Sequence, residues 1–255
     1  AAYIGFDATA ASLHVGSMIQ LMLLRHLRAH GHRAIALMGH ATTLVGDPSD
    51  KDGLRPMLNE DAIRQNAHGI ESLVTNIVPG VEIRSNLDWF GPMSFLQFMR
   101  EHGRHFTVNR MLSMDVVARR IAQNKPLTIM EFGYMLMQSV DFLELRRREG
   151  CILQCGGSDQ WSNIIGGVEL IRKVDGRQAF GITTPLMTDD QGRKMGKTAA
   201  GKAIWLDPAK LSSFDLWQFW RNVPDSKVPE FLGLFTELPM NEVRRLAALT
   251  GSQIN

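Results

Sequence analysis

The sequence predicts an α/β protein: a Rossmann-like parallel sheet with helices on both faces, a helical insertion and a C-terminal helical segment. Short apolar runs of strand type alternate with stretches in which apolar residues recur at helical spacing. A long helical stretch separates two such strand–helix halves, and a Trp- and Phe-rich helical stretch follows the second half. Parallel strands need crossover connections, which the intervening helices would provide.

The first half is expected to contain three strands and two helices. The predicted strands are residues 2–6, 34–38 and 81–84. A helix is expected from Ser12 onward, and a second helix at residues 61–77. The prediction of the first helix is based on apolar residues at helical spacing, namely Leu13, Met18, Leu21, Leu24 and Leu27.

The helical pattern then runs from about Met93 to Arg148, and the second half follows it. A buried strand is expected at residues 151–155, and another strand is expected to end at residues 185–187. A Gly- and Lys-rich loop covers residues 192–201, and helices are expected from Asp207 onward. Ligands of such folds bind at the carboxyl ends of the strands, near the topological switch point.

The composition is that of a folded protein that is not a dedicated nucleic-acid binder. The 255 residues are 44% hydrophobic, which allows a real core. The formal charge is only +2, from 28 Lys and Arg against 26 Asp and Glu. RNA contacts would therefore depend on local patches such as Arg146-Arg147-Arg148, which could equally be a solvated helix end.

The two cysteines, Cys151 and Cys155, have C-x3-C spacing and no second pair to complete a zinc site. We expect buried free thiols and no tightly bound metal. The sequence has no signal peptide and no long apolar run, so we expect a cytoplasmic protein without membrane contact. Because the chain starts inside a strand-like run, further residues are expected to precede it.

A strand, a small-residue loop and a helix start follow one another between Tyr3 and Ser17. Such a loop directs backbone N–H groups and a helix N-terminus toward an anion. His14 can place an imidazole N–H beside a phosphate oxygen, and Gly16 leaves room for a flat base against the backbone. Alone, the pattern x-H-x-G is weak, and an ordinary turn capped by Ser12 explains it better.

A second motif, Gly192-Arg-Lys194-Met-Gly196-Lys197-Thr198, follows about 180 residues later. Two lysines three residues apart can close over a polyphosphate as point charges. Alone, an exposed basic loop is the better interpretation. Together, in this order and at this spacing, the two motifs resemble the HIGH and KMSKS motifs of class I aminoacyl-tRNA synthetases.

Further segments narrow the resemblance to the tyrosyl-tRNA synthetase family and cover nearly the whole chain. They are Tyr3-Ile-Gly-Phe-Asp7, Gly46-Asp47-Pro48-Ser49, Phe106-Thr-Val-Asn109-Arg-Met-Leu, Glu131-Phe-Gly-Tyr134-Met-Leu-Met-Gln138-Ser-Val-Asp141-Phe, Gln154-Cys-Gly-Gly157-Ser-Asp159-Gln160-Trp161 and Trp205-Leu-Asp207-Pro208. The resemblance implies a tyrosine–tRNA ligase. Such an enzyme activates L-tyrosine with ATP to tyrosyl-adenylate and pyrophosphate, and then transfers tyrosine to the 3′-terminal adenosine of tRNA(Tyr).

One set of polar side chains is unusual on residue chemistry alone. Tyr134, Gln138 and Asp141 lie at i, i+4 and i+7, so they share one face of a helix. Flanking apolar residues make a solvent-facing stripe less plausible, and buried polar groups without partners are costly. These three side chains therefore suit the lining of a polar amino-acid pocket.

The resemblance assigns roles to this pocket. Asp141 and Tyr3 would contact the phenol hydroxyl of tyrosine, and a buried pair of this kind would reject phenylalanine. The substrate ammonium group would be held by Asp47, Tyr134 and Gln138. The pocket would be lined or supported by Gln154 and Gln160.

The resemblance also assigns residues to ATP and to catalysis, with Mg²⁺ expected on the phosphates. Lys51 and Arg55 match basic residues that grip pyrophosphate, although simple surface charge explains them equally well. The expected ATP-binding residues are Gly5, Asp7, Gly16, Ser17, Gly157, Asp159 and Lys197. The expected catalytic residues are His14, Thr9, Lys194, Lys197, Thr198, Lys51 and Arg55, which would stabilise charge on the phosphates.

The chain departs from the family pattern at several positions. Ser17 stands where the family often has His, so its assignment is less secure, and the second motif reads KMGKT. Ala8 and Ala11 stand where Pro and Asp are common. None of these differences removes His14 or the motif lysines.

The resemblance implies a division of the chain into four parts. Residues 1–92 and 149–205 would be the two halves of the catalytic domain, and residues 93–148 a connective insertion for dimer formation and acceptor-stem binding. Residues 206–255 would be an incomplete helical segment. A homodimer is expected.

Three rival interpretations remain open. A synthetase-like binding module could have lost catalysis, but His14 and the Lys194/Lys197 pair argue against it. A related nucleotidyl-transferase could activate tryptophan or a pantoate-like acid, but the Tyr3/Asp141 pair argues against that. A purely structural α/β domain would leave the polar residues at the strand ends unexplained.

Overall fold

The computed structural model describes residues 1–48, 57–189, 191–192, 195–196 and 203–249. The chain divides into two compact units. The first, here called the sheet unit, consists of Ala1–Ala11 and Leu24–Pro185. The second, here called the helical unit, consists of Ser12–Leu23 and Leu186–Asn255. Each unit is described by itself.

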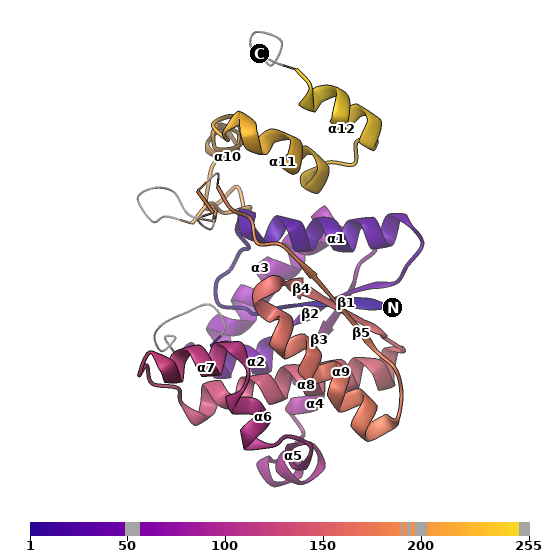
Figure 1. Ribbon diagram of the computed structural model, residues 1–255, viewed down its shortest axis with the longest axis vertical. Helices are drawn as coiled ribbons and strands as arrows, with labels where there is room; N and C mark the ends of the chain where they lie inside the picture. Colours follow the sequence, from indigo (N-terminus) through magenta and orange to yellow (C-terminus); the bar gives the residue numbers. More distant parts are fainter. Residues whose placement is uncertain (49–56, 190, 193–194, 197–202, 250–255) are drawn as a thin grey trace. The chain divides into compact units, whose positions relative to one another are not determined.

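The sheet unit contains a five-stranded parallel sheet with the strand order β3-β2-β1-β4-β5 (Figure 1). The order reverses between β1 and β4, which makes this the topological switch point. The predicted parallel sheet is thereby confirmed. The strands are β1 (Ala2–Phe6), β2 (Ala34–Met38), β3 (Glu82–Ser85), β4 (Leu153–Gly157) and β5 (Phe180–Thr184).

The last strand ends earlier than predicted. β5 stops at Thr184, and residues 185–187 lie outside it. Proline has no backbone N–H to donate to a ladder, so Pro185 terminates the pairing with β4. The expected strand at residues 151–155 likewise begins only at Leu153, and its pairing continues to Gly157.

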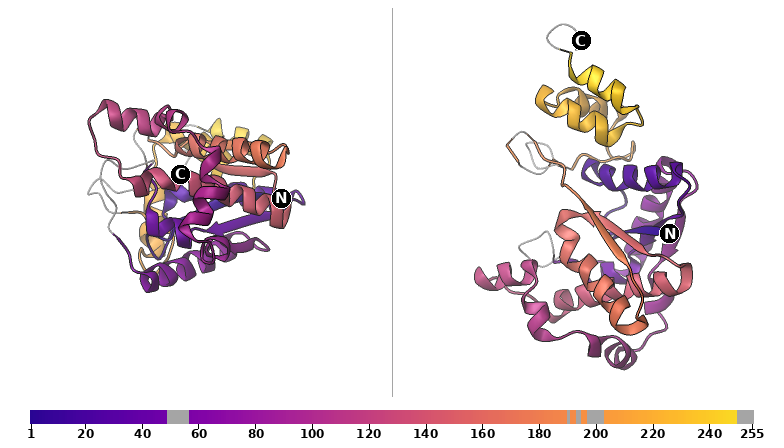
Figure 2. Two further views of the ribbon diagram at one scale, coloured as in Figure 1. Left: turned by 90° about the horizontal axis from the view of Figure 1, so that it is seen from below. Right: turned by 45° about the vertical axis from the view of Figure 1, so that its right-hand side comes forward.

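Helices cover both faces of the sheet, as predicted. Figure 1 shows α3 on one side of the sheet and α8 and α9 on the other. α8 and α9 lie side by side (Figure 2, right). The helices of this unit are α2 (His40–Val45), α3 (Glu60–Ile77), α4 (Leu87–Phe90), α5 (Phe95–Glu101), α6 (Val108–Leu112), α7 (Asp115–Ala122), α8 (Ile129–Glu149) and α9 (Trp161–Asp175), with the short 3-10 turns η2 (Gly103–His105) and η3 (Ser158–Gln160). The boundary between the two units falls within α1 (Met18–Ala29), which follows the 3-10 turn η1 (Val15–Ser17) of the helical unit.

The main core joins the sheet to α8 and α9. Tyr3, Ile35 and Leu37 from β1 and β2 pack with a set of fully buried side chains from the two helices. That set is Val140, Phe142, Leu143, Leu145, Leu170 and Ile171. Each such side chain contributes roughly 1.5–3 kcal/mol by leaving water. This burial fixes the rotation of α8 against the sheet, and with it the direction of its polar face.

The two ends of α8 are defined by local chemistry. At its start, the side chain of Thr128 accepts from Glu131 N, and the side chain of Glu131 accepts from Thr128 N, which is a capping box. At its end, Gly150 adopts φ 64°, a left-handed conformation that glycine reaches without steric cost. Arg147 in the last turn pairs with Asp175 at 2.7 Å, and Arg148 pairs with Glu144 at 2.8 Å.

The predicted helical insertion, residues 93–148, contains α5, η2, α6, α7 and all of α8 except its last residue. Met111, Met114 and Val117 pack against Met135 and Leu136 of α8 in a small separate core. An ion pair joins the same elements, with Arg120 Nη1 3.2 Å from Glu131 Oε1 and the two side chains only 4% and 5% exposed.

The helical unit contains η1 and the start of α1, followed by α10 (Ser213–Arg221), η4 (Asp225–Lys227), α11 (Val228–Phe235) and α12 (Met240–Ala247). The helices begin at Ser213 rather than at Asp207 as predicted. Val15 and Ile19 share a core with Met187, Ile204 and Phe231. Among the residues that the structure describes, no helix is long and apolar enough to cross a membrane.

The buried ion pair gives a stability prediction. Arg120→Leu should lower the free energy of unfolding by about 3–5 kcal/mol, because the carboxylate of Glu131 would stay buried without its cation. Urea-unfolding curves measure this change. Arg119→Leu is the matched control, since Arg119 is exposed on the same helix, and it should change the value by less than about 0.5 kcal/mol. Equal effects of the two substitutions would contradict the prediction.

Candidate active site

The candidate site lies at the carboxyl ends of β1, β2, β3 and β4, where the segments that follow the strands meet. β1 pairs in parallel with both β2 and β4, so their carboxyl ends share one edge of the sheet. Asp7 comes directly after β1 and Asn86 directly after β3, while α2 starts at His40 after β2. α8 adds its polar face at the same place, through the contacts described next.

Asp7 connects the loop after β1 to two helices. Tyr134 Oη donates to Asp7 Oδ2 at 3.0 Å, and Thr42 Oγ1 donates to Asp7 Oδ1 at 2.8 Å. Tyr134 is buried, and burial followed by the nearby charge of Asp7 raises the pKa of its phenol well above the ordinary value. Its hydroxyl therefore stays protonated and remains a donor to the carboxylate.

Asp141 is a buried carboxyl group held by two uncharged donors. Trp89 Nε1 donates to Asp141 Oδ1 at 2.9 Å, and Asn86 Nδ2 lies 3.3 Å from Asp141 Oδ2. Burial raises the pKa of Asp141 well above its ordinary value, although the two hydrogen bonds oppose the shift. The two hydrogen bonds hold the carboxyl group in one fixed direction.

Asn86 ties this carboxyl group to Asp7 in one hydrogen-bonded chain. Its Nδ2 also donates to Thr42 Oγ1 at 3.0 Å, and its Oδ1 accepts from Ala41 N at 2.8 Å. Since Thr42 donates to Asp7, the chain runs from Tyr134 through Asp7, Thr42 and Asn86 to Asp141. Two members of the polar face of α8 are thus joined by residues from β1, α2 and the turn after β3.

Tyr3 and Gln154 stand side by side, because the register of β1 and β4 pairs these two residues. Both are buried, at 1% and 2% exposure. Tyr3 Oη and Gln154 Oε1 have no hydrogen-bond partner among the described residues. Burial, followed by the charge of Asp141, raises the pKa of Tyr3. Two buried polar atoms without partners, on residues that are paired in the sheet, indicate a candidate place where a ligand hydroxyl can bond.

A second polar chain joins the segment after α2 to α8 and α9. Gln160 Nε2 donates to Asp47 Oδ2 at 3.0 Å, and Asn163 Nδ2 donates to Gln160 Oε1 at 3.2 Å. Asn163 Nδ2 also donates to Gln138 Oε1 at 2.9 Å. The amide of Gln138 is therefore oriented with its oxygen toward Asn163. The predicted residues Asp47, Gln138 and Gln160 are brought together by these bonds.

His14, Gly16 and Ser17 of the first sequence motif lie in the helical unit, together with the described residues of the second motif. His14 Nδ1 accepts from Gly16 N at 3.0 Å, so the neutral ring carries its proton on Nε2. Val15 N donates to Ile204 O, and Ile204 N donates to Gly196 O. A Cβ atom at Gly196 would lie 3.4 Å from the His14 ring. The described residues of the two motifs are thus connected through Ile204 and through the contact of Gly196 with the His14 ring.

The remaining predicted residues are placed as follows. Gly5 and Thr9 are exposed, in β1 and in the loop after it, and Ser17 ends η1. Gly157 ends β4, and Asp159 is in η3 at the start of the segment that leads into α9. Five predicted residues lie outside the described part of the chain: Lys51, Arg55, Lys194, Lys197 and Thr198.

Four residues of the site were missed from the sequence: Asn86, Trp89, Thr42 and Asn163. Asn86 and Trp89 carry a usable signal, since they directly follow the carboxyl end of a predicted strand. Thr42 lies in the segment after the second predicted strand and had the same signal. Asn163 had none beyond its place one helical turn from Gln160.

Fold and site together define a doubly wound α/β protein with a buried polar cluster at its switch point and, in its helical unit, a His motif in contact with Gly196. This is the class of nucleotide-binding α/β proteins to which class I synthetases belong. The sequence model for class I tRNA synthetases (W and Y) matches residues 1–255. The chain belongs to this family.

Several relatives carry the same name. The chain is 54% identical to the tyrosine–tRNA ligase of Caulobacter vibrioides over 260 residues, which cover 100% of this chain and 62% of the relative. It is 52% identical to that of Rhodospirillum rubrum and 50% identical to that of Pseudomonas aeruginosa, with the same coverage. The chain thus spans about 62% of the length of these relatives.

Solved structures agree on the fold. A C-terminally truncated mitochondrial tyrosyl-tRNA synthetase of Aspergillus nidulans has a TM-score of 0.84 at 29% identity, covering 96% of this chain and 74% of that one. A tyrosyl-tRNA synthetase of Archaeoglobus fulgidus complexed with L-tyrosine has a TM-score of 0.67 at 18% identity, covering 91% and 70%. The latter likeness shows the shared fold alone.

The raised pKa of Asp141 predicts a pH dependence of stability. Because the folded protein holds the proton more tightly than the unfolded chain, this group stabilises the fold at low pH. Its contribution is lost as the pH rises above about 4, the ordinary pKa of aspartate, until the folded pKa is passed. The stability of the wild type relative to Asp141→Asn should therefore fall with pH, by at most about 1.4 kcal/mol per pH unit.

Urea unfolding of both proteins at a series of pH values measures this difference. All other titrating groups are shared, so they cancel to first order. A difference that rises with pH in favour of the wild type would show that the folded protein stabilises the anion, contrary to the prediction.

Proposed function

We propose that this chain is the amino-acid-activating part of a tyrosine–tRNA ligase. The observation that carries the proposal is the buried set of Asp141, Tyr3 and Gln154 at the switch point of the sheet. Asp141 is fixed by Trp89 and Asn86. Tyr3 and Gln154 present polar atoms without partners among the described residues. A phenol hydroxyl of a substrate can bond to this set, whereas the phenyl ring of phenylalanine cannot.

The amino end of the substrate is assigned to the second polar chain. Asp47 and Gln138 are oriented by Gln160 and Asn163, and Tyr134 is held by Asp7. Carboxylate, amide and phenol oxygens are acceptors for the three donors of an ammonium group. Gln154 and Gln160 then line or support the pocket. A ligand with an ammonium group at one end and a hydroxyl at the other satisfies both polar groups.

ATP is the second proposed substrate. Gly5, with open space around its Cα, and Gly157 allow a nucleotide to approach the backbone closely. Asp7 and Asp159 would accept from ribose hydroxyls, with Gly16 and Ser17 assigned to the same nucleotide. His14, Thr9, Lys194, Lys197, Thr198, Lys51 and Arg55 are assigned to the phosphates, and Mg²⁺ would accompany them. These roles follow the family pattern.

The chemistry needs no nucleophile from the protein. A carboxylate oxygen of tyrosine attacks the α-phosphorus of ATP, the bond to the β-phosphate oxygen breaks, and pyrophosphate leaves. A ribose hydroxyl of the terminal adenosine of tRNA(Tyr) then attacks the carbonyl carbon, and AMP leaves. The protein lowers the barrier by positioning and by stabilising developing charge.

The four-part division of the chain belongs to the same proposal. Residues 1–92 and 149–205 would carry activation, residues 93–148 the dimer and acceptor-stem contacts, and residues 206–255 a helical segment. A homodimer through the insertion is supported by its exposed apolar side chains, which include Phe95 at 75% and Ile129 at 91% exposure. A cytoplasmic location completes the proposal.

Activation of tryptophan is the alternative within the same family. ATP–pyrophosphate exchange measured with each amino acid in turn decides between the two. Exchange with tyrosine and much less with phenylalanine or tryptophan is expected, and exchange only with tryptophan would overturn the proposal. A chain that binds tyrosine without any exchange would be a binding module and not an activating one.

Tyr3→Phe should lower the preference for tyrosine over phenylalanine by roughly tenfold, because it removes one neutral hydrogen bond to the substrate hydroxyl. That a site built around a hydroxyl rejects analogues lacking it is a rule illustrated by this enzyme family itself. Tyr134→Phe is the matched control, since it alters the only other tyrosine of the chain, at the ammonium end. It should weaken both amino acids alike. The ratio of kcat/KM values in the exchange assay measures both effects.

Lys197→Ala should lower the rate of tyrosyl-adenylate formation by roughly a hundredfold, with tyrosine binding nearly unchanged, because the lysine is assigned to phosphate charge in the transition state. Single-turnover kinetics and equilibrium dialysis with tyrosine separate the two quantities. Lys227→Ala, which removes a lysine paired with Glu230 at 2.8 Å, is the control. A collapse of tyrosine affinity in Lys197→Ala would show that the assigned role is wrong.

A further inference from the structure

The loop that follows β1 is held by two helices through one residue, Ala8. Ala8 N donates to Thr43 Oγ1 on α2 at 2.8 Å, and Ala8 O accepts from Asn66 Nδ2 on α3 at 2.9 Å. Ala8 itself is fully buried, at 0% exposure. Both polar groups of its backbone are therefore bonded to side chains that are 35 and 58 residues distant in the chain.

The hydroxyl group of Thr43 is oriented by a second hydrogen bond. Thr43 Oγ1 donates its one proton to Gly39 O, four residues earlier, and a lone pair remains to accept from Ala8 N. Thr43 is buried, so loss of this hydroxyl would leave the N–H of Ala8 unsatisfied. A proline at residue 8, which is common in the family, could not use this anchor, because proline has no N–H.

α3 approaches the same loop with no side chain between them. A Cβ atom at Gly69 would lie 2.3 Å from Ala11 O and 3.1 Å from Ala11 C, and the first of these distances is too short for any side chain. Glycine inside a helix is less favourable than alanine. The close approach of loop and helix accounts for a glycine at this position.

The residues on either side of Ala8 are assigned to ATP. Asp7 precedes it and is bonded to Tyr134 and Thr42, and the exposed Thr9 follows it. The N–H of Ala8 belongs to the peptide plane that it shares with Asp7, and its carbonyl belongs to the plane shared with Thr9. Thr43 and Asn66 therefore fix the two peptide planes through which Asp7 and Thr9 are connected.

We propose that Thr43 and Asn66 are positioning residues for ATP, which hold the loop after β1 so that Asp7 and Thr9 meet the nucleotide without rearrangement. The inference rests on the proposed function, which assigns those two residues to ATP. Neither Thr43 nor Asn66 needs to touch the nucleotide. Small displacements of groups that contact a substrate lower affinity and rate strongly, which is why the backbone of Ala8 is held at both of its polar groups.

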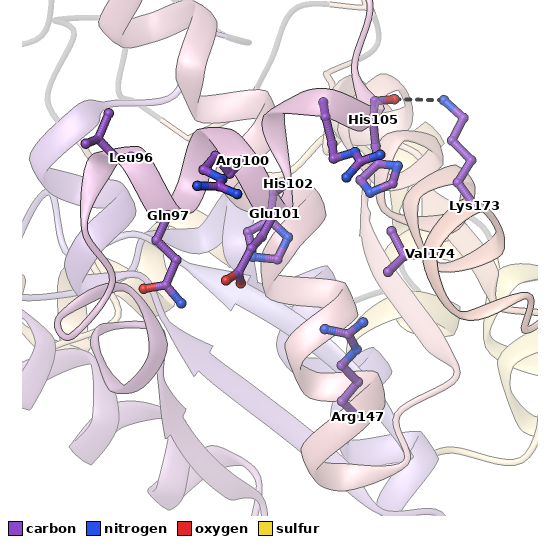
Figure 3. A pocket seen from close by; sticks show the side chains of 10 residues that line it. Leu96, Gln97, Arg100, Glu101, His102, His105, Arg147, Lys173 and Val174 are labelled. Carbon is purple, nitrogen blue, oxygen red and sulfur yellow. Dashed lines mark hydrogen bonds between the residues drawn. The ribbon is translucent and has the colours of Figure 1, made fainter.

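A basic hollow of about 840 Å³ lies elsewhere, between α5, η2 and the last turns of α8 and α9 (Figure 3). Neither the loop after β1 nor its two anchors line this hollow. A nucleotide bound there would not respond to substitutions at Thr43 or Asn66. A change in nucleotide affinity in such variants therefore reports on the loop.

The test measures binding of α,β-methylene-ATP to the full chain by titration calorimetry, and KM values for ATP and tyrosine by pyrophosphate exchange. Thr43→Val and Asn66→Leu should each weaken analogue binding and raise KM for ATP by roughly fivefold to tenfold, the effect of one lost hydrogen bond. KM for tyrosine should change by less than about twofold. Thr43→Ser keeps the hydroxyl and should restore the wild-type values.

Gly69→Ala tests the loop without removing a hydrogen bond. Alanine favours the helix, but its Cβ atom would displace the carbonyl of Ala11, so nucleotide affinity should fall by a similar factor. Gly233→Ala on α11 is the matched control, because a Cβ atom there meets nothing within 4 Å. Thr75→Val is the control for Thr43, since Thr75 Oγ1 likewise donates to the carbonyl four residues earlier. Both controls should bind the analogue as the wild type does.

Urea unfolding of every variant shows that it is folded under the assay conditions. The proposal is overturned if Thr43→Val and Asn66→Leu bind the analogue as the wild type does, if Thr43→Ser is no better than Thr43→Val, or if ATP and tyrosine are weakened alike. It is also overturned if the wild type does not bind the analogue. A wild type that binds the analogue but catalyses no exchange with any amino acid contradicts the proposed function alone, and calorimetry then still decides the role of the two anchors.

Discussion

The buried carboxyl group of Asp141 is the constraint on which the arrangement of the sheet unit depends. A carboxyl group 4% exposed among apolar neighbours destabilises the fold unless donors reach it. The donors, Trp89 and Asn86, come from the segment after β3. β3 must therefore be in register with β2, and Asn86 N donates to Met38 O at the end of that strand. Through Asn86 the same constraint extends to α2, to Asp7 and back to Tyr134 on α8.

This network explains how one site can recognise two unlike groups. At one end, uncharged donors hold a carboxyl group whose pKa is raised by burial, and the buried Tyr3 Oη and Gln154 Oε1 have no partner within the part of the chain that the structure describes. That end offers hydrogen-bonding groups to a hydroxyl. At the other end, the carboxylate of Asp47 accepts a hydrogen bond from the amide of Gln160. In the proposed function, the selectivity for a hydroxylated amino acid depends on the different hydrogen-bonding groups at the two ends.

The sequence predicted the fold class and the polar face of α8, because both depend on local periodicity. The spacing of Tyr134, Gln138 and Asp141 needs only the helix that contains them. The partners of Asp141 could not be obtained in this way, since Asn86 and Trp89 are 55 and 52 residues distant in the chain. Which donor meets which carboxylate is decided by strand register, which periodicity leaves open. The early end of β5 is a smaller case, in which the missing N–H of Pro185 decided the boundary.

The His motif and the Gly- and Lys-rich motif were each weak alone, and the packing of one imidazole explains why they occur together. A Cβ atom at Gly16 would lie 2.8 Å from His14 Cε1, too close for any side chain while the ring accepts from Gly16 N. A Cβ atom at Gly196 would lie 3.4 Å from the same carbon. The first glycine is therefore required by the orientation of His14, and the second glycine gives the ring room. Because Gly196 O also accepts from Ile204 N, whose own carbonyl accepts from Val15 N, the same contacts fix the backbone on both sides of the ring. His14 is thus held in one tautomer by its own turn, with the proton of the neutral ring on Nε2.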